Sequence, residues 1–248
     1  MNANPIKICS RKREKSIQTG LKFIDKHGGI PAHEITEICG KPGVGKTFLL
    51  HQIAFNFVRS GTNKFAILFD IDKSFSSEKI IKLCSIFEED CESILNRILV
   101  HQFSNDEIVI KAIQSIPHRL QGDFLIIVDS VPNLFVSNLL YEEEENWPDE
   151  YLYRIIRFGS LLRKALKFAT IVTSNQVRAI PQAVTKRTDY FWRDEGVRPA
   201  LGHIWEEFID NRLYIKKIRR DLRVIVIVFS SGLPETFGLI KFFGDHFE

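Results

Sequence analysis

The sequence lacks the features that would place the protein in a membrane or in an oxidising compartment. No apolar run approaches the roughly 20 residues that a membrane span needs, and the N-terminus has no signal-peptide core. The four cysteines (Cys9, Cys39, Cys84 and Cys91) form no C-x-x-C pair and have no histidine at zinc-finger spacing. We therefore expect reduced thiols in an intracellular protein.

The sequence also has only a small net charge and no internal repeat. A formal net charge of +3 is too small to indicate nucleic-acid binding by itself, so only local basic clusters could do so. We find no internal repeat, low-complexity segment or interdomain linker. Residues 1–18 are polar and basic and are predicted to be a tail, whereas residues 19–248 are predicted to form one domain.

What the sequence does contain is a phosphate-binding loop at residues 40–47. The stretch Gly-Lys-Pro-Gly-Val-Gly-Lys-Thr matches G-x-x-x-x-G-K-[ST] at every fixed position, between a predicted strand and an apolar helix. Glycines let the backbone turn tightly and aim N–H groups at phosphate oxygens, and the helix N-terminus adds partial positive charge. Lys46 can reach the β- and γ-phosphates, and the Thr47 hydroxyl can bind Mg²⁺. The predicted nucleotide-binding residues are Gly40, Lys41, Pro42, Gly43, Val44, Gly45, Lys46 and Thr47.

Two further apolar strands are predicted to end in carboxylates. One leads into Asp70 and Asp72, and the other ends at Asp129. In phosphate-loop enzymes, an aspartate in the second of these positions lies beside the loop and holds Mg²⁺ through its water shell. We therefore expect Thr47 and Asp129 at the metal. Asp72 could be a catalytic base, a group in the Mg²⁺ shell, or merely a carboxylate at a strand end.

Strand-like and helix-like segments alternate along most of the chain. Such alternation predicts an α/β fold with a mostly parallel sheet between helices, and the last segments predict antiparallel strands. Residues 136–150 are predicted to be an exposed loop, and residues 177–199 have no clear periodicity. The predicted strands are 34–39, 64–70, 97–103, 124–129, 170–175, 211–218, 223–229 and 237–243, and the main predicted helices are 48–58, 76–87, 106–120 and 151–168.

The segment without periodicity combines basic and aromatic side chains. This combination suits single-stranded DNA, because bases stack on aromatic rings while arginine neutralises phosphates. The alternative is a solvated loop with some buried rings. The candidate DNA contacts are Lys186, Arg187, Tyr190, Phe191, Trp192 and Arg193.

Five ordered motifs resemble the RecA-type recombinase ATPases, specifically the eukaryotic strand-exchange recombinases and their paralogues. The resemblance extends from residue 19 to about residue 243 and implies a RecA-like ATPase core, ATP and Mg²⁺ as ligands, and a nuclear location. It also implies that Gln176 senses the γ-phosphate or DNA, although a glutamine there could simply cap a helix or turn. The motifs are residues 19–37, 40–47, 125–130, 173–177 and 199–205.

The sequence departs from this family in four places. Only eighteen residues precede the core, without the helical DNA-binding domain or the Phe-x-x-Ala docking segment of the strand-exchange enzymes. Asp72 aligns with the usual catalytic glutamate but is one methylene shorter, and misplacement by about 1 Å can cost about 10²-fold in rate. The first DNA loop carries four glutamates at 142–145, which would repel phosphate, and the cap region at 194–199 lacks an Asp-Pro step.

These departures favour a recombinase paralogue that assists homologous-recombination repair by remodelling or stabilising a recombinase filament on single-stranded DNA. The expected partners are that filament, another paralogue or a small adaptor protein, and single-stranded DNA. Hydrolysis of ATP is expected to be slow or absent. One alternative is a catalytically active DNA-dependent ATPase or strand-exchange enzyme. Another is a RecA-fold motor outside recombination, against which the motif at 199–205 argues.

Overall fold

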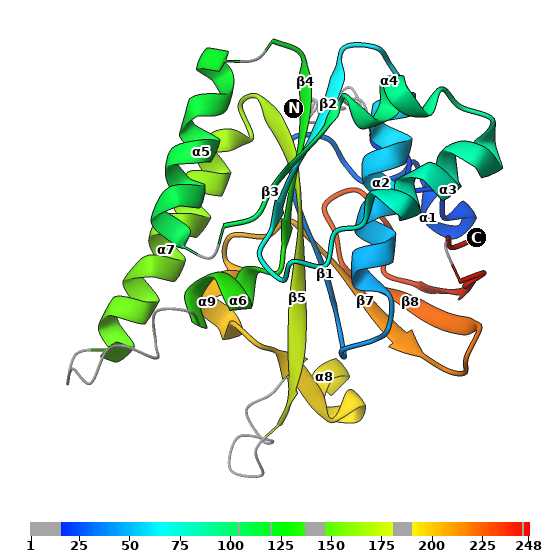
Figure 1. Ribbon diagram of the computed structural model, residues 1–248. Coiled ribbons are helices and arrows are strands. Elements are labelled where there is room, and N and C mark those ends of the chain that lie inside the picture. Colours follow the sequence, from blue (N-terminus) through cyan, green and yellow to red (C-terminus); the bar gives the residue numbers. More distant parts are fainter. Residues whose placement is uncertain (1–15, 104, 120, 137–146, 181–189, 245) are drawn as a thin grey trace, which may run out of the picture.

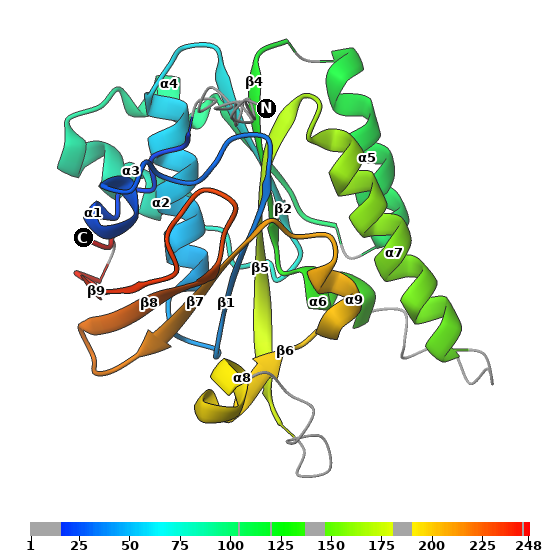
Figure 2. The ribbon, with the colours of Figure 1, turned by 180° about the vertical axis from the view of Figure 1, so that it is seen from behind.

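The computed structural model describes residues 16–103, 105–119, 121–136, 147–180, 190–244 and 246–248. These residues form a nine-stranded sheet with helices on both faces (Figures 1 and 2). The strands are β1 (Ile35–Gly40), β2 (Lys64–Asp70), β3 (Ile98–His101), β4 (Asp123–Asp129), β5 (Ala169–Ala179), β6 (Val197–Pro199), β7 (Asn211–Lys217), β8 (Leu222–Phe229) and β9 (Phe237–Lys241). The helices are α1 (Lys22–Asp25), α2 (Lys46–Arg59), α3 (Ser77–Phe87), α4 (Cys91–Leu95), α5 (Asp106–Arg119), α6 (Val131–Val136), α7 (Trp147–Ala165), α8 (Tyr190–Glu195) and α9 (Gly202–Glu206).

The strand order confirms the predicted fold class. Six strands, in the order β3-β2-β4-β5-β1-β7, are parallel, and β8 and β9 continue the sheet in antiparallel pairing. Strand β6 pairs antiparallel with β5, outside the main order. The carboxyl ends of parallel strands lie at one edge of a sheet, and polar residues placed there can converge on a ligand.

The core has two layers because the central strands are covered on both faces. Successive residues of β2 divide between the layers: Ile67 packs toward α5 and α7, and Leu68 packs toward α2 and α3. Ile126 and Ile127 of β4 divide in the same way. Side chains of a strand alternate between faces, so a strand buried on both sides needs a continuous apolar run. None of the described helices is long and apolar enough to span a membrane.

Two predicted element boundaries differ from those in the structure. Strand β5 continues through Ala179 because residues 177–179 pair with β6, which the sequence pattern does not show. Helix α7 begins at Trp147, so the predicted loop at 136–150 ends earlier. Ile17, which precedes the predicted domain boundary, is buried and bridges Ile30; residues 1–15 of the predicted tail lie outside the described part.

Candidate functional site

The phosphate loop connects the end of β1 to the start of α2, in the middle of the sheet (Figure 1). Gly43 and Gly45 have φ values of 74° and 106°, a backbone conformation that glycine adopts readily. A Cβ atom on Gly45 would also lie 2.6 Å from the ring of Phe247, and one on Gly40 would lie 2.5 Å from the carbonyl oxygen of Ile215. The glycines are therefore required both by the turn and by the packing behind it.

The Lys46 ammonium lies inside the curve of this loop. Its Nζ donates hydrogen bonds to the carbonyl oxygens of Gly40 (2.9 Å) and Lys41 (3.1 Å). Burial lowers the pKa of Lys46, and the negative charge of Asp129 acts in the opposite direction. A partly buried cation beside the N-terminus of a helix is a suitable partner for a phosphate anion.

The two predicted metal-binding residues are in contact. Thr47 Oγ1 donates a 2.7 Å hydrogen bond to Asp129 Oδ2, and Ser174 Oγ donates to Asp129 Oδ1. Burial raises the pKa of Asp129, whereas the hydrogen bonds from Ser174 and Thr47 lower it. A hydroxyl and a carboxylate beside a phosphate loop are the hard oxygen ligands that Mg²⁺ prefers. The residues present therefore fit a magnesium ion bound together with a nucleotide.

The structure separates the roles of the two carboxylates at the end of β2, Asp70 and Asp72. Asp70 is buried and accepts hydrogen bonds from the backbone N–H groups of Ser74 (2.9 Å) and Phe75 (3.0 Å), so it fixes the turn after the strand. Asp72 lines the cavity beside the loop. Its Oδ1 accepts hydrogen bonds from Ser130 Oγ (3.0 Å), Ser130 N (3.3 Å) and Asn133 Nδ2 (2.8 Å). The sequence analysis did not identify Asn133, which lies in the unpredicted helix α6.

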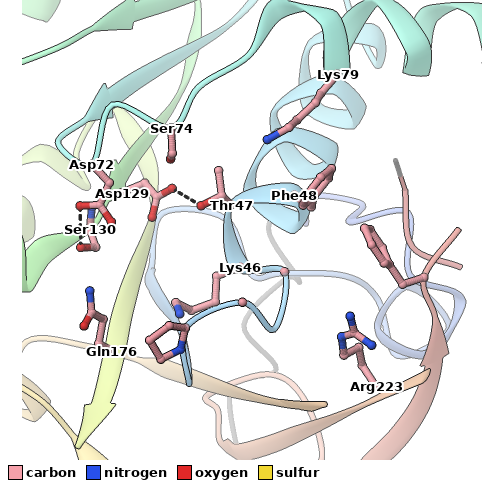
Figure 3. Close-up of a pocket in the computed structure, with 14 residues that line it drawn as sticks. Lys46, Thr47, Phe48, Asp72, Ser74, Lys79, Asp129, Ser130, Gln176 and Arg223 are labelled. Atoms are coloured by element: carbon pink, nitrogen blue, oxygen red, sulfur yellow. Dashed lines mark hydrogen bonds between the residues drawn. The ribbon is translucent and has the colours of Figure 1, made fainter. Parts of the chain in front are cut away.

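Four neighbouring strands, β2, β4, β5 and β1, bring the predicted groups together. Gly40 at the end of β1 is in register with Gln176 of β5, and Asp70 is in register with Asp129. The predicted catalytic residues Asp72 and Gln176 consequently line one cavity of about 340 Å³ with Lys46 (Figure 3). The other residues that line this cavity are Pro42, Gly43, Gly45, Thr47, Phe48, Ser74, Lys79, Asp129, Ser130, Arg223 and Phe242.

Two lining residues from the C-terminal part of the chain, Arg223 in β8 and Phe242 directly after β9, were not predicted at the site. No local motif points to them, because they reach the loop only through the pairing of β8 and β9 with the rest of the sheet. Phe48 could have been identified, since it directly follows Thr47 in the sequence.

Among the candidate DNA contacts, the described rings are packed rather than free. Trp192 is 4 % exposed and contacts Phe191 and Tyr214, with ring centroids 4.8 and 5.4 Å apart. These rings hold α8 against the sheet, as in the alternative with buried rings, and the predicted base-stacking role of Trp192 is not available in this structure. Lys186, Arg187 and the acidic run at 142–145 lie outside the described residues, as do the side chains of Tyr190 and Arg193.

A buried polar network lies beside the loop and was also not predicted. Glu37 of β1 accepts hydrogen bonds from Arg212 Nε (2.6 Å) and Trp205 Nε1 (2.7 Å). Asn175 Nδ2 donates a third, of 2.8 Å. The network connects the strand before the phosphate loop to β5, β7 and α9. It therefore fixes the position of the strand that carries the loop relative to the strand that carries Gln176.

The comparison with known families agrees with this geometry. The Rad51 family model matches residues 10–243, which is most of the chain. Proteins of this family generally use ATP and Mg²⁺, bind single-stranded DNA and form filaments or complexes with paralogues. The match supports a role in DNA recombination and repair. The chain belongs to the Rad51 family and comprises its RecA-like core ATPase domain.

Proposed function

We propose that the protein is an ATP-binding recombinase paralogue that assists homologous-recombination repair, by remodelling or stabilising a recombinase filament on single-stranded DNA. Under this proposal it acts in the nucleus, and its nucleotide is mainly a structural or regulatory ligand. The observation that carries the proposal is the environment of Asp72, which stands where the family's catalytic glutamate is expected.

Asp72 is poorly placed to activate a water molecule. A general base must reach the attacking water with a free oxygen in a suitable position. The Asp72 side chain is one methylene shorter than glutamate, and its Oδ1 already accepts three hydrogen bonds from Ser130 and Asn133. These bonds hold the carboxylate toward α6. Slow or absent hydrolysis follows from this arrangement.

Binding of ATP needs none of this activation. The Lys46 ammonium and the loop N–H groups would hold the β- and γ-phosphates, and the Gln176 side chain would contact the γ-phosphate. Thr47 and Asp129 would hold Mg²⁺, directly and through water respectively. Bound there, the ion would neutralise phosphate charge. The nucleotide could thus stabilise one arrangement of the loop and of β5.

A second surface supports binding of a protein partner. Strand β3 ends the sheet order, and among the described residues no strand pairs with its outer side, which can therefore pair with an added strand. Beside it lies an apolar pocket of about 430 Å³, whose rings include Phe69, His101 and Phe103. An extended segment of a recombinase or of another paralogue could pair with β3 and place an apolar side chain in this pocket.

The second candidate function is a DNA-dependent ATPase or strand-exchange enzyme. The complete arrangement of Lys46, Thr47 and Asp129 favours it, because these groups suffice to bind and orient the phosphates. The two functions differ in whether the protein hydrolyses the ATP that it binds.

The test is ATP binding and turnover by the purified protein, with and without single-stranded DNA, beside Lys46→Ala and Asp72→Glu. We expect ATP binding that Lys46→Ala abolishes, and turnover close to the Lys46→Ala background in both conditions. Asp72→Glu should raise turnover if the rest of the site is competent. DNA-stimulated turnover that Lys46→Ala removes would overturn the adaptor proposal in favour of the enzyme.

A further inference from the structure

Strand β9 lies at the end of the sheet order opposite β3, with α1 beside it (Figure 2). Its pairing with β8 determines which of its backbone groups are used. Ile227 N–H donates to the carbonyl oxygen of Thr236 (2.8 Å), and Phe242 N–H donates to that of Asp221 (2.7 Å). Hydrogen-bonded and non-hydrogen-bonded pairs alternate along an antiparallel ladder. The even-numbered residues of β9 therefore bond to β8, and the odd-numbered residues direct their N–H and C=O groups away from it.

The backbone of Lys241 shows that this outer edge of β9 accepts a further strand. Its N–H and C=O pair with the C=O (2.9 Å) and N–H (3.0 Å) of Glu248, which runs antiparallel beside it. Phe237 and Leu239 direct the same groups outward, and no strand among the described residues pairs with them. An added strand could bond to these two residues in the way that Glu248 bonds to Lys241.

The side chains on one face of this edge are apolar and open to solvent. Phe237 and Leu239 are 68 % and 62 % exposed, although both belong to a strand. On the same face they lie opposite Val226 and Val224 of β8. Adjacent exposed apolar side chains of this kind are typical of interaction surfaces.

The other face of the edge is aromatic and cationic. Gly238 has no side chain, and the ring of Phe23 lies against it: a Cβ atom on Gly238 would be 2.4 Å from that ring. Lys26 Nζ lies 5.2 Å from the centroid of Phe23. Together with Phe237 and Leu239, these residues line an open groove of about 600 Å³ between α1 and β9, which we call the β9 groove.

The charges around the β9 groove favour an acidic ligand. Lys26 and Lys241 are exposed, and neither forms an ion pair with another described residue. Lys22, by contrast, is already paired with Glu248. The acidic Glu235 precedes β9, so it lies at the opposite end of the strand from Lys241. A carboxylate beside Lys26 or Lys241 would gain a partner that the chain does not supply.

Two other occupants fit the β9 groove less well. In an antiparallel pair of β9 strands centred on Gly238, residue 235 of a second copy would lie opposite Lys241, where Glu248 already pairs. Residues 7–15 of the chain are predominantly basic, so they would be repelled by Lys26. These arguments leave a segment of another protein.

We propose that the edge of β9 from Phe237 to Leu239 is a docking site for an extended, acidic segment of a partner protein, which adds a strand to the sheet. Backbone hydrogen bonds would hold the segment, as in other complexes formed by strand addition. Its alternate side chains would contact Phe237 and Leu239 on one face and Phe23 on the other, and a carboxylate would pair with Lys26. The site is separate from the apolar pocket at β3 and does not depend on a bound nucleotide.

The experiment is fluorescence anisotropy with a short labelled peptide of alternating valine and glutamate. The control peptide has lysine in place of glutamate. We expect the glutamate peptide to bind the wild type with a Kd below about 1 mM, and the lysine peptide to bind at least about tenfold more weakly.

Three protein variants assign the binding to the β9 groove. Leu239→Pro removes an outward N–H that β8 does not use, so the sheet should still form while binding falls at least about tenfold. Lys26→Glu should weaken the glutamate peptide and strengthen the lysine peptide, each by about fivefold. Lys82→Glu is the control, because Lys82 is exposed on α3 and does not line the groove; it should behave as the wild type.

Three results would overturn the docking site: no binding at about 1 mM glutamate peptide, equal affinity for the two peptides, or unchanged affinity in Leu239→Pro. An equal effect of Lys26→Glu and Lys82→Glu would likewise exclude the pairing with Lys26. If Leu239→Pro does not fold, Leu239→Asp decides in its place, because that side chain is already largely exposed. It should fold and bind the glutamate peptide at least about tenfold more weakly, and unchanged affinity would again exclude the site.

Discussion

At the scale of single residues, His51 shows how burial determines the response to acid. It lies on α2 directly behind the phosphate loop, is 2 % exposed, and packs edge-to-face on Phe75 at 5.0 Å. Burial, assisted by the positive charge of Lys79, lowers the pKa of His51 to about 4. The folded protein therefore keeps this imidazole neutral, whereas an unfolded chain protonates it near pH 6.5.

This pKa difference predicts a loss of stability in weak acid. Between pH 6.5 and 4 the unfolded state binds a proton at His51 that the folded state does not, so stability falls as the pH falls. From pH 7.5 to pH 5 the free energy of unfolding should decrease by about 2 kcal/mol through this group. Urea unfolding of the wild type and of His51→Leu at both pH values measures it. The same loss in His51→Leu would assign the effect to another group.

The buried Glu37–Arg212 pair gives the second prediction at this scale. The exposed fractions of the two side chains are 0 % and 1 %. Arg212→Met would leave the Glu37 carboxylate buried with one cation fewer, which typically costs about 3–5 kcal/mol of unfolding free energy. Arg219→Met is the control, because the Arg219–Asp221 pair is exposed and such pairs contribute about 0–1 kcal/mol.

Chemical unfolding of these variants and of Glu37→Gln/Arg212→Met checks this prediction. The double variant should recover part of the loss, because it removes the unpaired charge. If Arg212→Met were as stable as Arg219→Met, the pair would have no such role.

At the scale of elements, the edge strand β3 and the neighbouring helix α5 give a prediction about partner binding. Ile108 of α5 lines the apolar pocket and is 47 % exposed. Ile81 of α3 has nearly the same exposure, 48 %, but does not line this pocket. Ile108→Glu would place a charge where an apolar partner side chain is expected.

We expect Ile108→Glu to weaken binding to a strand-exchange recombinase or to another paralogue at least about tenfold, as buried interface residues commonly do. Ile81→Glu should bind as the wild type, and nucleotide binding should be unchanged in both. Biolayer interferometry with the immobilised variants measures the effect. An equal loss in the two variants would mean that this pocket is not the docking site.

The elements also show what local sequence can and cannot predict. Short sequence patterns predict the phosphate loop, the strand ending at Asp129 and the helices α2, α3 and α5. Each pattern lies within one strand, one helix or the turn between them. The pairing of β5 with β6 cannot be predicted in this way, because residues 180–196 separate its two sides in the sequence. Helix α6 is short, and its Asn133 reaches Asp72 only after β2 and β4 have paired.

The division of roles between Asp70 and Asp72 was equally inaccessible to sequence reasoning. Asp70 is the last residue of β2, and Asp72 follows it after one intervening residue. Their roles depend on whether each side chain turns into the loop after β2 or toward α6. Residue type does not determine that direction. Arg223 and Phe242, which line the cavity, were missed for the same reason, since neither β8 nor the residue that follows β9 carries a nucleotide motif.

At the scale of the whole molecule, the nucleotide site joins distant parts of the chain. The loop lies between β1 and α2, and Arg223 and Phe242 come from the far side of the sheet order. A ligand that binds only the folded state at 100 times its Kd adds about 2.7 kcal/mol to the free energy of unfolding. For a chain of this size, this corresponds to a rise in Tm of roughly 5–10 °C.

Thermal unfolding with and without Mg²⁺ and ATP measures this stabilisation. Lys46→Ala should abolish the rise, because it removes the ammonium that lies inside the loop and would bind the phosphates. A rise of the same size in Lys46→Ala would show that ATP stabilises the protein at another place.

The packing of Phe247 behind Gly45 also bears on how the protein is made. Residues 40–47 leave the ribosome early, but the ring that supports them and the arginine that binds Val44 are synthesised about 180 to 200 residues later. Until those residues have docked, the loop lacks the ring behind Gly45 and the hydrogen bond to Val44. A nascent chain should therefore acquire nucleotide affinity only after β8 and the segment following β9 have emerged. Nucleotide binding would then report that the last part of the sheet has assembled.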